Sequence, residues 1–370
     1  MLIIGAGITG AMIADSLVAA GREVVLVDTR GPAKGSTSAS TALVQYEIDT
    51  PLAELTRKIG KRDAVRAWRR SRLAVDAIAA RLDELGVASV ARRDTLYLTG
   101  ELLNAGEMEH ERDVRRAAGF ACRLIDRREL RTRFGISRPA ALQCYGDLVI
   151  DPRRATLALL HAAQAGGARL YAPARIADLQ GARPPLTAIA ENGRTIRCEH
   201  AIFATGYELP RGMPHAGHQI VSTWAIATVA QPRRLWPGPC MITEAAQPYL
   251  YLRTTPGGRV ICGGEDEEIS DAKARDALIG KKTRILRRKL GRLLRGLDTT
   301  VEYAWCGTFG QSRTGLPTIC RLPGRPRCHV ALGYGGNGTT YARIAADVIC
   351  GAITGHPDDD ADLYDLGRRG

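Results

Sequence analysis

Three glycines and an aspartate near the N-terminus have the types and the spacing of a site for phosphates and ribose. Gly5, Gly7 and Gly10 follow the apolar run 2–4 directly, and Asp28 stands 18 positions after Gly10. The first glycine permits a tight turn, the second lets the backbone approach a pyrophosphate, and the third lets a helix pack closely on a strand. Asp28 can accept hydrogen bonds from a ribose diol. The pattern predicts a dinucleotide-binding unit, and the charge of Asp28 disfavours NADP.

The same stretch is apolar enough to be compared with an export signal. It lacks a basic start, Asp15 interrupts it, and the second strand follows without a break, so we expect no signal peptide. No apolar run reaches the roughly 18 residues that span a bilayer. The nine cysteines form no CxxC pair, which disfavours a disulfide framework or a metal site and favours reduced thiols. We therefore expect a cytoplasmic protein without a bound metal.

The chain is basic, with 52 Lys and Arg against 39 Asp and Glu and a formal net charge of +13. Such an excess can attract nucleic acid, an anionic membrane or an anionic substrate. The basic residues are spread along the chain, however, and only 5% of residues are aromatic, which leaves few platforms for stacking bases. We expect no nucleic-acid partner. The basic helix predicted over 271–295 is interpreted as a solvated surface helix, with a peripheral membrane contact as the alternative.

Apolar periodicity and turn residues indicate the elements that surround the glycine-rich unit. Asp151 and Pro152 are typical of a helix N-cap and first position. Trp68 lies on the apolar face of one predicted helix, and we expect it in the core. Helices are predicted over 52–60, 61–85, 102–118 and 154–164, and strands over 95–99, 140–150, 217–229, 249–253 and 259–263.

Three further segments accompany the N-terminal unit. The run 35–41 is rich in Ser and Thr, the strand 201–206 ends in an Ala-Thr-Gly turn, and the glycine-rich stretch 333–340 leads into a helix over 341–353. Taken in order, these segments resemble the FAD-dependent amine and amino-acid oxidoreductases, the group of D-amino acid oxidase, glycine oxidase and sarcosine oxidase. The resemblance covers nearly the whole chain, and its two ends are the specific parts.

The resemblance implies an α/β fold of two domains. One is a discontinuous, Rossmann-like FAD-binding domain made of residues 1–86, 150–216 and 300–370. The other is a substrate domain with a large antiparallel β-sheet, made of residues 87–149 and 217–299.

The resemblance also implies the residues that contact FAD. Asp28 and Thr29 would meet the adenosine ribose, and Arg175 and Ile176 would meet adenine. The pyrophosphate would lie along Gly5, Ala6, Gly7, Ile8, Thr9 and Gly10, and the phosphates and flavin along Ser36, Thr37, Ser38 and Thr41, with Ala204, Thr205 and Gly206 nearby. The flavin ring would be reached by Gly333, Tyr334, Gly335, Gly336, Asn337, Gly338, Thr339 and Thr340. A glycine-rich turn that opens a helix can stabilise the negative charge of reduced flavin through backbone donors.

The reaction that the resemblance implies is transfer of a hydride from the C–N carbon of an amine or amino acid to flavin N5, with hydrolysis of the imine. The flavin does the difficult step, so we assign no catalytic residue, and the His residues form no motif. Oxygen or another compound would accept the electrons. Two alternatives stay open: an FAD-dependent dehydrogenase for C–OH donors, of the 2-hydroxy acid or glycerol-3-phosphate type, and a non-catalytic flavoprotein subunit. Oligomeric state is left open.

The substrate end of the site is less specific. Relatives that take amino acids clamp the carboxylate with an arginine, and glycine oxidase-like proteins carry it near the position of Thr308 or Phe309. This chain has no arginine at those positions. We therefore consider Arg253 or Arg313 as the residue that binds the carboxylate, and Tyr249 and Tyr251 as further substrate-binding residues. Alternation places Tyr249, Tyr251 and Arg253 on one strand face, either in the site or towards solvent. Cys306 raises the alternative of a covalent flavin link, although we expect FAD to be held non-covalently.

Overall fold

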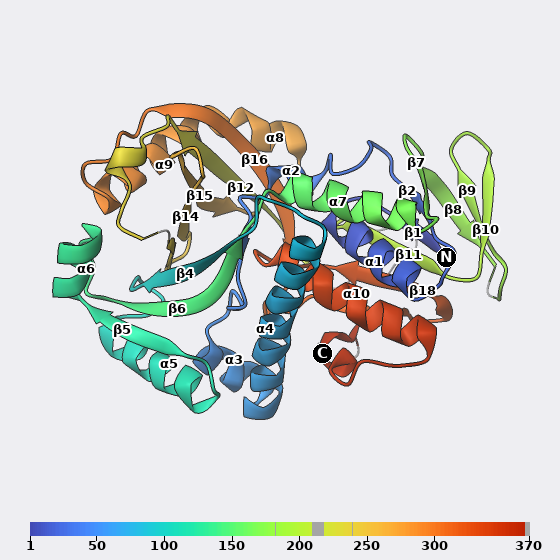
Figure 1. Cartoon of the computed structure of the whole chain (residues 1–370), viewed down its shortest axis with the longest axis horizontal. Coiled ribbons are helices and arrows are strands. Elements are labelled where there is room, and N and C mark those ends of the chain that lie inside the picture. The colour runs from blue at the N-terminus through green and yellow to red at the C-terminus, as the bar shows by residue number, and fades with distance from the viewer. Residues whose placement is uncertain (182, 209–217, 239, 367–370) are drawn as a thin grey trace.

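Two large β-sheets, each with its own helices, make up the molecule. The computed structural model describes residues 1–181, 183–208, 218–238 and 240–366 of the 370-residue chain. Within these residues one sheet has six strands, one has nine, and a third has three. Figure 1 shows the six-stranded sheet on the right and the nine-stranded sheet on the left, with strands and helices of both meeting at the centre. The predicted α/β class with a large, mainly antiparallel second sheet is confirmed.

The six-stranded sheet is built around the N-terminal strand. β1 (Leu2–Ile4) pairs in parallel with β2 (Val25–Val27) and β11 (Ala201–Gly206). The outer strands are β7 (Arg169–Tyr171) on one side and β18 (Arg325–Leu332) with β17 (Thr318–Leu322) on the other. Parallel strands are buried on both faces, which is why β1 is an unbroken apolar run.

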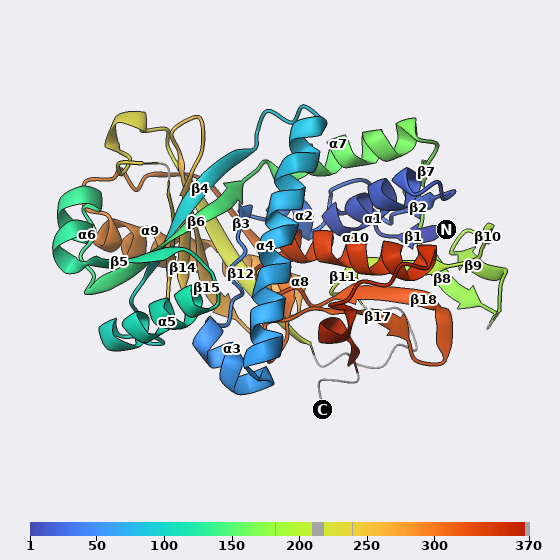
Figure 2. The ribbon, with the colours of Figure 1, turned by 60° about the horizontal axis from the view of Figure 1, so that its bottom comes forward.

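Each face of the six-stranded sheet is covered. Ile3 and Leu26 belong to the cluster that includes α1 (Ile8–Ala19), α7 (Pro152–Ala165) and α10 (Gly338–Thr354). Leu2 and Val27 face the opposite way, towards the small sheet of β8 (Ile176–Gln180), β9 (Leu186–Ala190) and β10 (Thr195–Cys198). Figure 2 shows the long helix α4 (Lys61–Glu84) crossing α10. Trp68 on α4 is fully buried, as predicted.

The nine-stranded sheet has the order β16-β12-β15-β14-β13-β4-β6-β3, with β5 also paired to β6. On one of its faces, Trp224 and Leu252 pack against Leu286 and Leu290 of α9 (Ile279–Leu293). The strand bounds are β3 Leu43–Val44, β4 Ala91–Leu98, β5 Cys122–Asp126, β6 Ala140–Val149, β12 Gln219–Thr228, β13 Met241–Glu244, β14 Leu250–Thr254, β15 Val260–Glu267 and β16 Val301–Gln311.

The expected domain boundaries differ from the strand pairing in two places. β3 and β16 fall in segments that we expected in the FAD-binding domain, yet both are strands of the nine-stranded sheet. The predicted boundary between residues 216 and 217 lies outside the described residues.

The helix predicted over 271–295 is two helices. α8 (Ala272–Ala277) and α9 are separated at Leu278. The indole N–H of Trp224 donates to the carbonyl oxygen of Arg275 at 3.2 Å, and the N–H of Leu278 donates to the same oxygen at 3.1 Å. That oxygen would accept the bond from residue 279 in a continuous helix, so a distant side chain ends α8.

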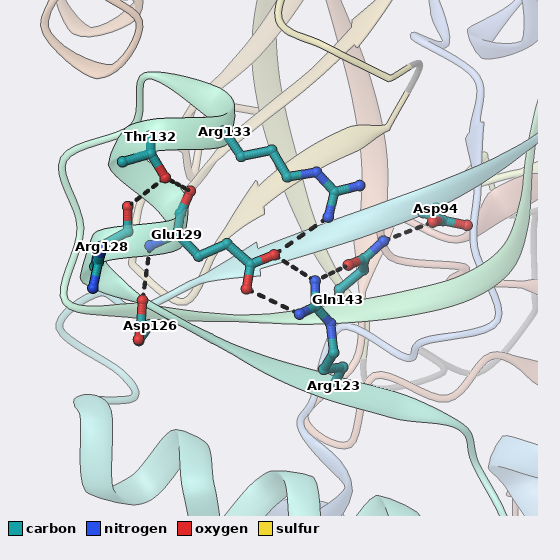
Figure 3. A network of polar contacts seen from close by, with 8 residues as sticks. All are labelled: Asp94, Arg123, Asp126, Arg128, Glu129, Thr132, Arg133 and Gln143. Atoms are coloured by element: carbon teal, nitrogen blue, oxygen red, sulfur yellow. Dashed lines mark hydrogen bonds and ion pairs between the residues drawn. The ribbon is translucent and has the colours of Figure 1, made fainter.

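The helices α3 (Leu52–Ile59) and α5 (Ala105–Ala117) lie close to their predicted positions. The helix α6 (Arg127–Phe134) was not predicted. In this part of the fold, Arg123 and Arg133 form ion pairs with Glu129. Arg123 on β5 forms a two-armed ion pair with Glu129 on α6, at 2.6 and 2.9 Å, and also donates to Gln143 (Figure 3). No described helix is long and apolar enough to cross a membrane.

Candidate active site: a cleft between the two sheets

A cavity of about 360 Å³ runs between the two large sheets. This volume lies within the range of small-molecule sites, roughly 300–1,000 Å³. One end lies at Asp28 and Arg175, and the other lies at Asp49, Tyr249 and Tyr251. The predicted residues that line it are Gly5, Gly7, Ile8, Thr9, Asp28, Thr29, Ser36, Thr37, Thr41, Arg175, Ala204, Thr205, Gly206, Tyr334, Gly335, Gly336, Asn337, Gly338, Thr339, Tyr249 and Tyr251.

The turn between β1 and α1 can be made only with glycine. Gly5 has φ +113°, and a Cβ there would lie 2.4 Å from the carbonyl oxygen of Ala204. A Cβ on Gly10 would lie 1.9 Å from the carbonyl oxygen of Gly5. The helix therefore approaches the strand as closely as backbone atoms allow, and it presents its N-terminus to the cleft. A helix N-terminus favours phosphate groups.

Asp28 is held by backbone donors. Its Oδ2 accepts from the N–H of Ala6 at 2.8 Å, and its Oδ1 accepts from the N–H groups of Arg30 and Gly31, each at 2.8 Å. These bonds orient the carboxylate at the cleft while lone pairs remain for a ribose diol. Ala174, which follows β7, donates its N–H to the carbonyl oxygen of Asp28 at 2.8 Å and brings Arg175 to the same end.

The Ser/Thr run contains a short helix, α2 (Ser36–Ala39). The Thr37 hydroxyl accepts from the N–H of Ile8 at 3.0 Å, and Ser36 donates to the carbonyl oxygen of Thr308 at 3.1 Å. The run thereby ties the first turn of α1 to β16. Thr37 acts as a helix cap delivered from another segment.

The turn before α10 is the second helix N-terminus in the cleft. Asn337 stands at the N-cap position but makes no capping bond, because its amide donates to the carbonyl oxygen of Glu47 at 2.7 Å. Thr340 donates in the same way to the carbonyl oxygen of Gln45 at 2.7 Å. The first backbone N–H groups of α10 are therefore left uncapped by Asn337, beside the cleft. They can serve a carbonyl or anionic group of a ligand.

The opposite end is acidic and aromatic. Asp49 opens on the cavity, and its Oδ2 accepts from the N–H of Gly336 at 2.7 Å. Burial raises the pKa of Asp49 to about 6, although the Gly336 bond acts the other way. Tyr249 and Tyr251 have ring centroids 5.4 Å apart, and Tyr251 shares a hydrogen bond of 3.1 Å with Thr223. Burial also raises the pKa of both phenols, which therefore stay protonated at neutral pH.

The two arginines considered for a carboxylate clamp lie outside the lining of the described cavity. Arg253 lies on the same side of β14 as Tyr251, but its guanidinium donates to the backbone carbonyl oxygens of Thr41 and Thr254. Burial lowers its pKa to about 10. Arg313 lies in the loop after β16, where its carbonyl oxygen accepts from Lys58 at 3.3 Å. Phe309 lines the cavity near the position where glycine oxidase-like proteins carry arginine.

Cys306 does not line the cleft. Its thiol lies 3.1 Å from Asp276 on α8, on the side of β16 that faces the helices. This placement does not support the covalent link that Cys306 suggested. Thr308, two residues further on, accepts from Arg275 of α8 at 2.7 Å.

Six of the residues predicted to contact FAD do not line the cavity. Ala6 and Gly10 shape the first turn through their backbones, and Gly333 packs against the His218 ring, where a Cβ would lie 2.0 Å from it. The hydroxyls of Ser38 and Thr340 are bonded to backbone carbonyl oxygens, and Ile176 belongs to the small sheet. The sequence did not point to Asp49, Thr223, Gln45, Arg30, Ala174 and Glu208, which line the cavity. Arg30, Ala174 and Glu208 stand beside segments that the sequence did mark, whereas Gln45, Asp49 and Thr223 come from segments without a motif.

The fold and the cleft define a class of protein that holds an extended dinucleotide between a Rossmann-like sheet and a large second sheet. A model of the FAD dependent oxidoreductase (DAO) family matches residues 1–351. The chain belongs to this family, and FAD is its cofactor.

Known proteins of similar fold cover nearly the whole chain. The L-proline dehydrogenase of P. horikoshii superposes with a TM-score of 0.83 at 18% identity, over 99% of this chain and 96% of that one. The glycine oxidase of Geobacillus kaustophilus does so with a TM-score of 0.79 at 19% identity, over 99% and 98%. At these identities the likeness speaks for the fold.

A relative of similar sequence is the tRNA 5-methylaminomethyl-2-thiouridine biosynthesis bifunctional protein MnmC of Cupriavidus necator. It is 24% identical over 415 residues, which cover 99% of this chain. The chain spans about 60% of the length of that curated relative.

The residues present fit FAD. The cleft is long, it places a carboxylate for ribose at one end, and it receives the N-termini of α1 and α10 along its length. The uncapped turn at Asn337 would be costly without a ligand that uses its N–H groups. When bound, FAD supplies a two-electron acceptor for oxidation of an organic donor.

Proposed function

We propose that the chain oxidises the carbon–nitrogen bond of an amine or amino acid. The carbon would give up a hydride to FAD, and the nitrogen would release a proton to water. Water then hydrolyses the imine to a carbonyl compound and the released amine. Oxygen or another acceptor removes the electrons from the protein in a second half-reaction. No side chain is required as an acid or base, because position and desolvation suffice for this donor class.

The observation that carries the proposal is the arrangement of the cleft around the N-terminus of α10. The turn 334–339 stands on one side, and Tyr249, Tyr251 and Thr223 stand across from it on the nine-stranded sheet. A donor held against these side chains would be closed off from water by the tyrosines, which burial keeps neutral. The names of the similar solved structures, L-proline dehydrogenase and glycine oxidase, refer to donors with a carbon–nitrogen bond.

For the residues that line the cavity, we propose the FAD contacts that the family resemblance implies. Gly7, Thr9 and Thr37 would lie along the pyrophosphate, Asp28 would bind ribose, and the turn before α10 would meet the flavin edge. We also propose that FAD is held non-covalently, since the Cys306 thiol is directed to Asp276. Nine cysteines without a disulfide support a reducing compartment, and we propose the cytoplasm.

Anaerobic reduction of the bound cofactor tests the proposal. Protein loaded with FAD is mixed with a panel of primary and secondary amines, D- and L-amino acids, and 2-hydroxy acids, and loss of the flavin absorbance is followed. We expect bleaching by at least one amine or amino acid and none by hydroxy acids. Bleaching by a hydroxy acid alone would favour the C–OH dehydrogenase, and failure of every donor would favour a non-catalytic subunit.

A further inference from the structure

The end of the cleft away from Asp28 is lined by one carboxyl group and two phenols, and a second carboxyl group, that of Asp266, interacts with the lining. We call it the acidic end, and it consists of Asp49, Asp266, Thr223, Tyr249 and Tyr251. Asp49 belongs to the chain before α3, whereas the others come from β12, from β15 and from β14 with the residue before it. Segments far apart in the sequence therefore bring these groups to one place.

Asp49 is fixed in position but not neutralised by a side chain. Among the described residues, it accepts a 2.7 Å hydrogen bond from the N–H of Gly336 at Oδ2. Its Oδ1 is close enough that a Cβ on Gly336 would lie 2.9 Å away, and the same Cβ would lie 3.1 Å from the Tyr249 hydroxyl. The carboxylate and the phenol therefore flank the turn that leads into α10. Both have lone pairs left for a ligand donor.

Asp266 supplies a second, independent sign of an absent partner. Asp266 interacts with Thr223, which lines the cavity. Its Oδ1 is buried and has no hydrogen-bond partner among the described residues. Leaving a buried acceptor unsatisfied is costly, more so when it is charged. Asp49 and Asp266 also interact repulsively with each other, so a cation between them would relieve both.

Among the described residues, the cationic side chains nearest to the acidic end are bonded to other groups. Lys282 donates to the carbonyl oxygen of Glu265 and pairs with Glu267, each at 2.7 Å. Arg253 is bonded to backbone carbonyl oxygens, and Arg275 to Thr308 and Asp276. The arginines that line the described cavity, Arg30 and Arg175, stand at the Asp28 end. Within the described residues the acidic end is thus a region of net negative charge.

Glu47 stands two residues before Asp49, and its charge acts on the buried carboxyl group of Asp147. Both carboxyl oxygens of Glu47 are buried and have no hydrogen-bond partner among the described residues. Burial, and then the charge of Glu47, raises the pKa of Asp147 well above its usual range. This pair adds no positive charge that could hold a carboxylate.

We propose, on the basis of the function proposed above, that the acidic end binds the ammonium group of a cationic amine without an α-carboxylate, and that Asp49 determines this specificity. An ammonium can pair with Asp49 and lie against the faces of the tilted tyrosine pair, which attract cations. The carboxylate of an amino acid would instead meet Asp49 and Asp266 without a counter-charge. Repulsion of that kind is how a site rejects one of two related ligands.

Matched donor pairs test this proposal on the FAD-loaded protein. Putrescine is compared with ornithine, and butylamine with norvaline, because each pair differs only in the α-carboxylate. The variants are Asp49→Asn and Asp266→Asn, with Asp49→Glu for rescue. Glu268→Gln is the control, since it removes one exposed carboxylate two residues from Asp266. Each protein is first titrated with FAD, so that a variant that loses the cofactor is identified. Binding alone is probed by the change in the flavin spectrum with tetramethylammonium, which cannot be oxidised, and with benzoate.

We expect the amines to bleach FAD at concentrations at least about tenfold lower than their amino-acid counterparts. Asp49→Asn should remove this preference, Asp49→Glu should restore part of it, and Glu268→Gln should leave it unchanged. Equal or better bleaching by the amino acids in the unmodified protein would overturn the inference while confirming carbon–nitrogen oxidation. If no donor bleaches FAD, a spectral response to tetramethylammonium that Asp49→Asn abolishes would support the cation site and refute the oxidation. A response to benzoate alone, or to neither probe, would refute the cation site.

Discussion

The side-chain amide of Asn337 donates to the carbonyl oxygen of Glu47 at 2.7 Å, across 290 positions of sequence. An asparagine at an N-cap normally accepts from its own helix. Here it ties the start of α10 to the segment 45–49 and leaves the first turn of the helix to a ligand. The same segment is bonded at two further points, through Thr340 and Gly336. This end of the cleft is thus formed jointly by segments 45–49 and 336–340.

Asn337→Asp should weaken FAD binding. The carboxylate cannot donate to Glu47, it can cap α10 itself, and it brings a negative charge to the place where reduced flavin is negative. We expect the dissociation constant for FAD to rise about tenfold or more, measured by quenching of FAD fluorescence. The exposed turn residue Asn192 provides the control Asn192→Asp, which should bind FAD normally. An unchanged dissociation constant for Asn337→Asp would contradict the assignment of this turn.

Gly10→Ala should destabilise the protein and abolish FAD binding. Its Cβ would stand 1.9 Å from the carbonyl oxygen of Gly5, so either the helix or the turn must move. Overpacking of this kind costs about 1–3 kcal/mol or more, and chemical denaturation measures it. Gly280→Ala in α9 is the matched substitution, since its Cβ would have no atom closer than 3.9 Å. It should be neutral or stabilising by about 0.5–1 kcal/mol. Equal stability of the two variants would refute the close packing.

Thr37→Val should weaken FAD binding through α1. The substitution keeps the shape of the side chain but removes the oxygen that accepts from the N–H of Ile8 at 3.0 Å. Loss of such a cap costs about 1 kcal/mol of stability, and the helix N-terminus at the pyrophosphate loses its anchor. Thr37→Ser should restore both stability and affinity. If Val and Ser variants bind FAD equally well, the hydroxyl has no role in placing α1.

The buried pair His200 and His329 should make the fold sensitive to acid. Their ring nitrogens lie 3.0 Å apart, and Arg327 lies 2.7 Å from His200. Burial lowers the pKa of His200 to about 4 and of His329 to about 3. Both are neutral in the folded protein but take up protons when unfolded below about pH 6.5. Their contribution is therefore complete above pH 6.5 and is lost as the pH falls towards 4 and then 3.

The measurement is thermal or denaturant unfolding of the unmodified protein and of His329→Gln at pH 7 and pH 5. Each histidine should account for about 2 kcal/mol of the loss between these values. The variant should be less stable at pH 7 but should lose less on acidification. An equal loss in both proteins would mean that His329 is already protonated in the folded state.

The phosphate end of the cleft could be predicted because its determinants are local. Gly5, Gly10 and Asp28 all lie within the first 28 residues. Steric limits require glycine at positions 5 and 10, and Asp28 accepts a hydrogen bond from the turn between them. The turn before α10 has the same character. Glycine spacing therefore predicted both helix N-termini of the site.

The acidic end could not be predicted, because the residues that assemble it are far apart in the sequence and have ordinary local meanings. Asp49 stands three residues before α3 and could be taken for part of a helix cap, yet Glu111 accepts the N–H groups of Leu52 and Ala53 at 2.8 Å. For Arg253, alternation indicated the correct face of the strand but not the direction of a long side chain. Its guanidinium turns to Thr41, and a similar long-range contact from Trp224 divides the helix predicted over 271–295.

Bound FAD should be reduced by the carbon–nitrogen bond of a donor held at the acidic end. The decisive measurement is a single anaerobic turnover with an amine that bleaches the flavin and with the same amine deuterated at the carbon that carries nitrogen. We expect one carbonyl product per FAD reduced and slower bleaching with deuterium. Bleaching by a hydroxy acid with none by any amine, or bleaching by an amine without a carbonyl product, would contradict this expectation.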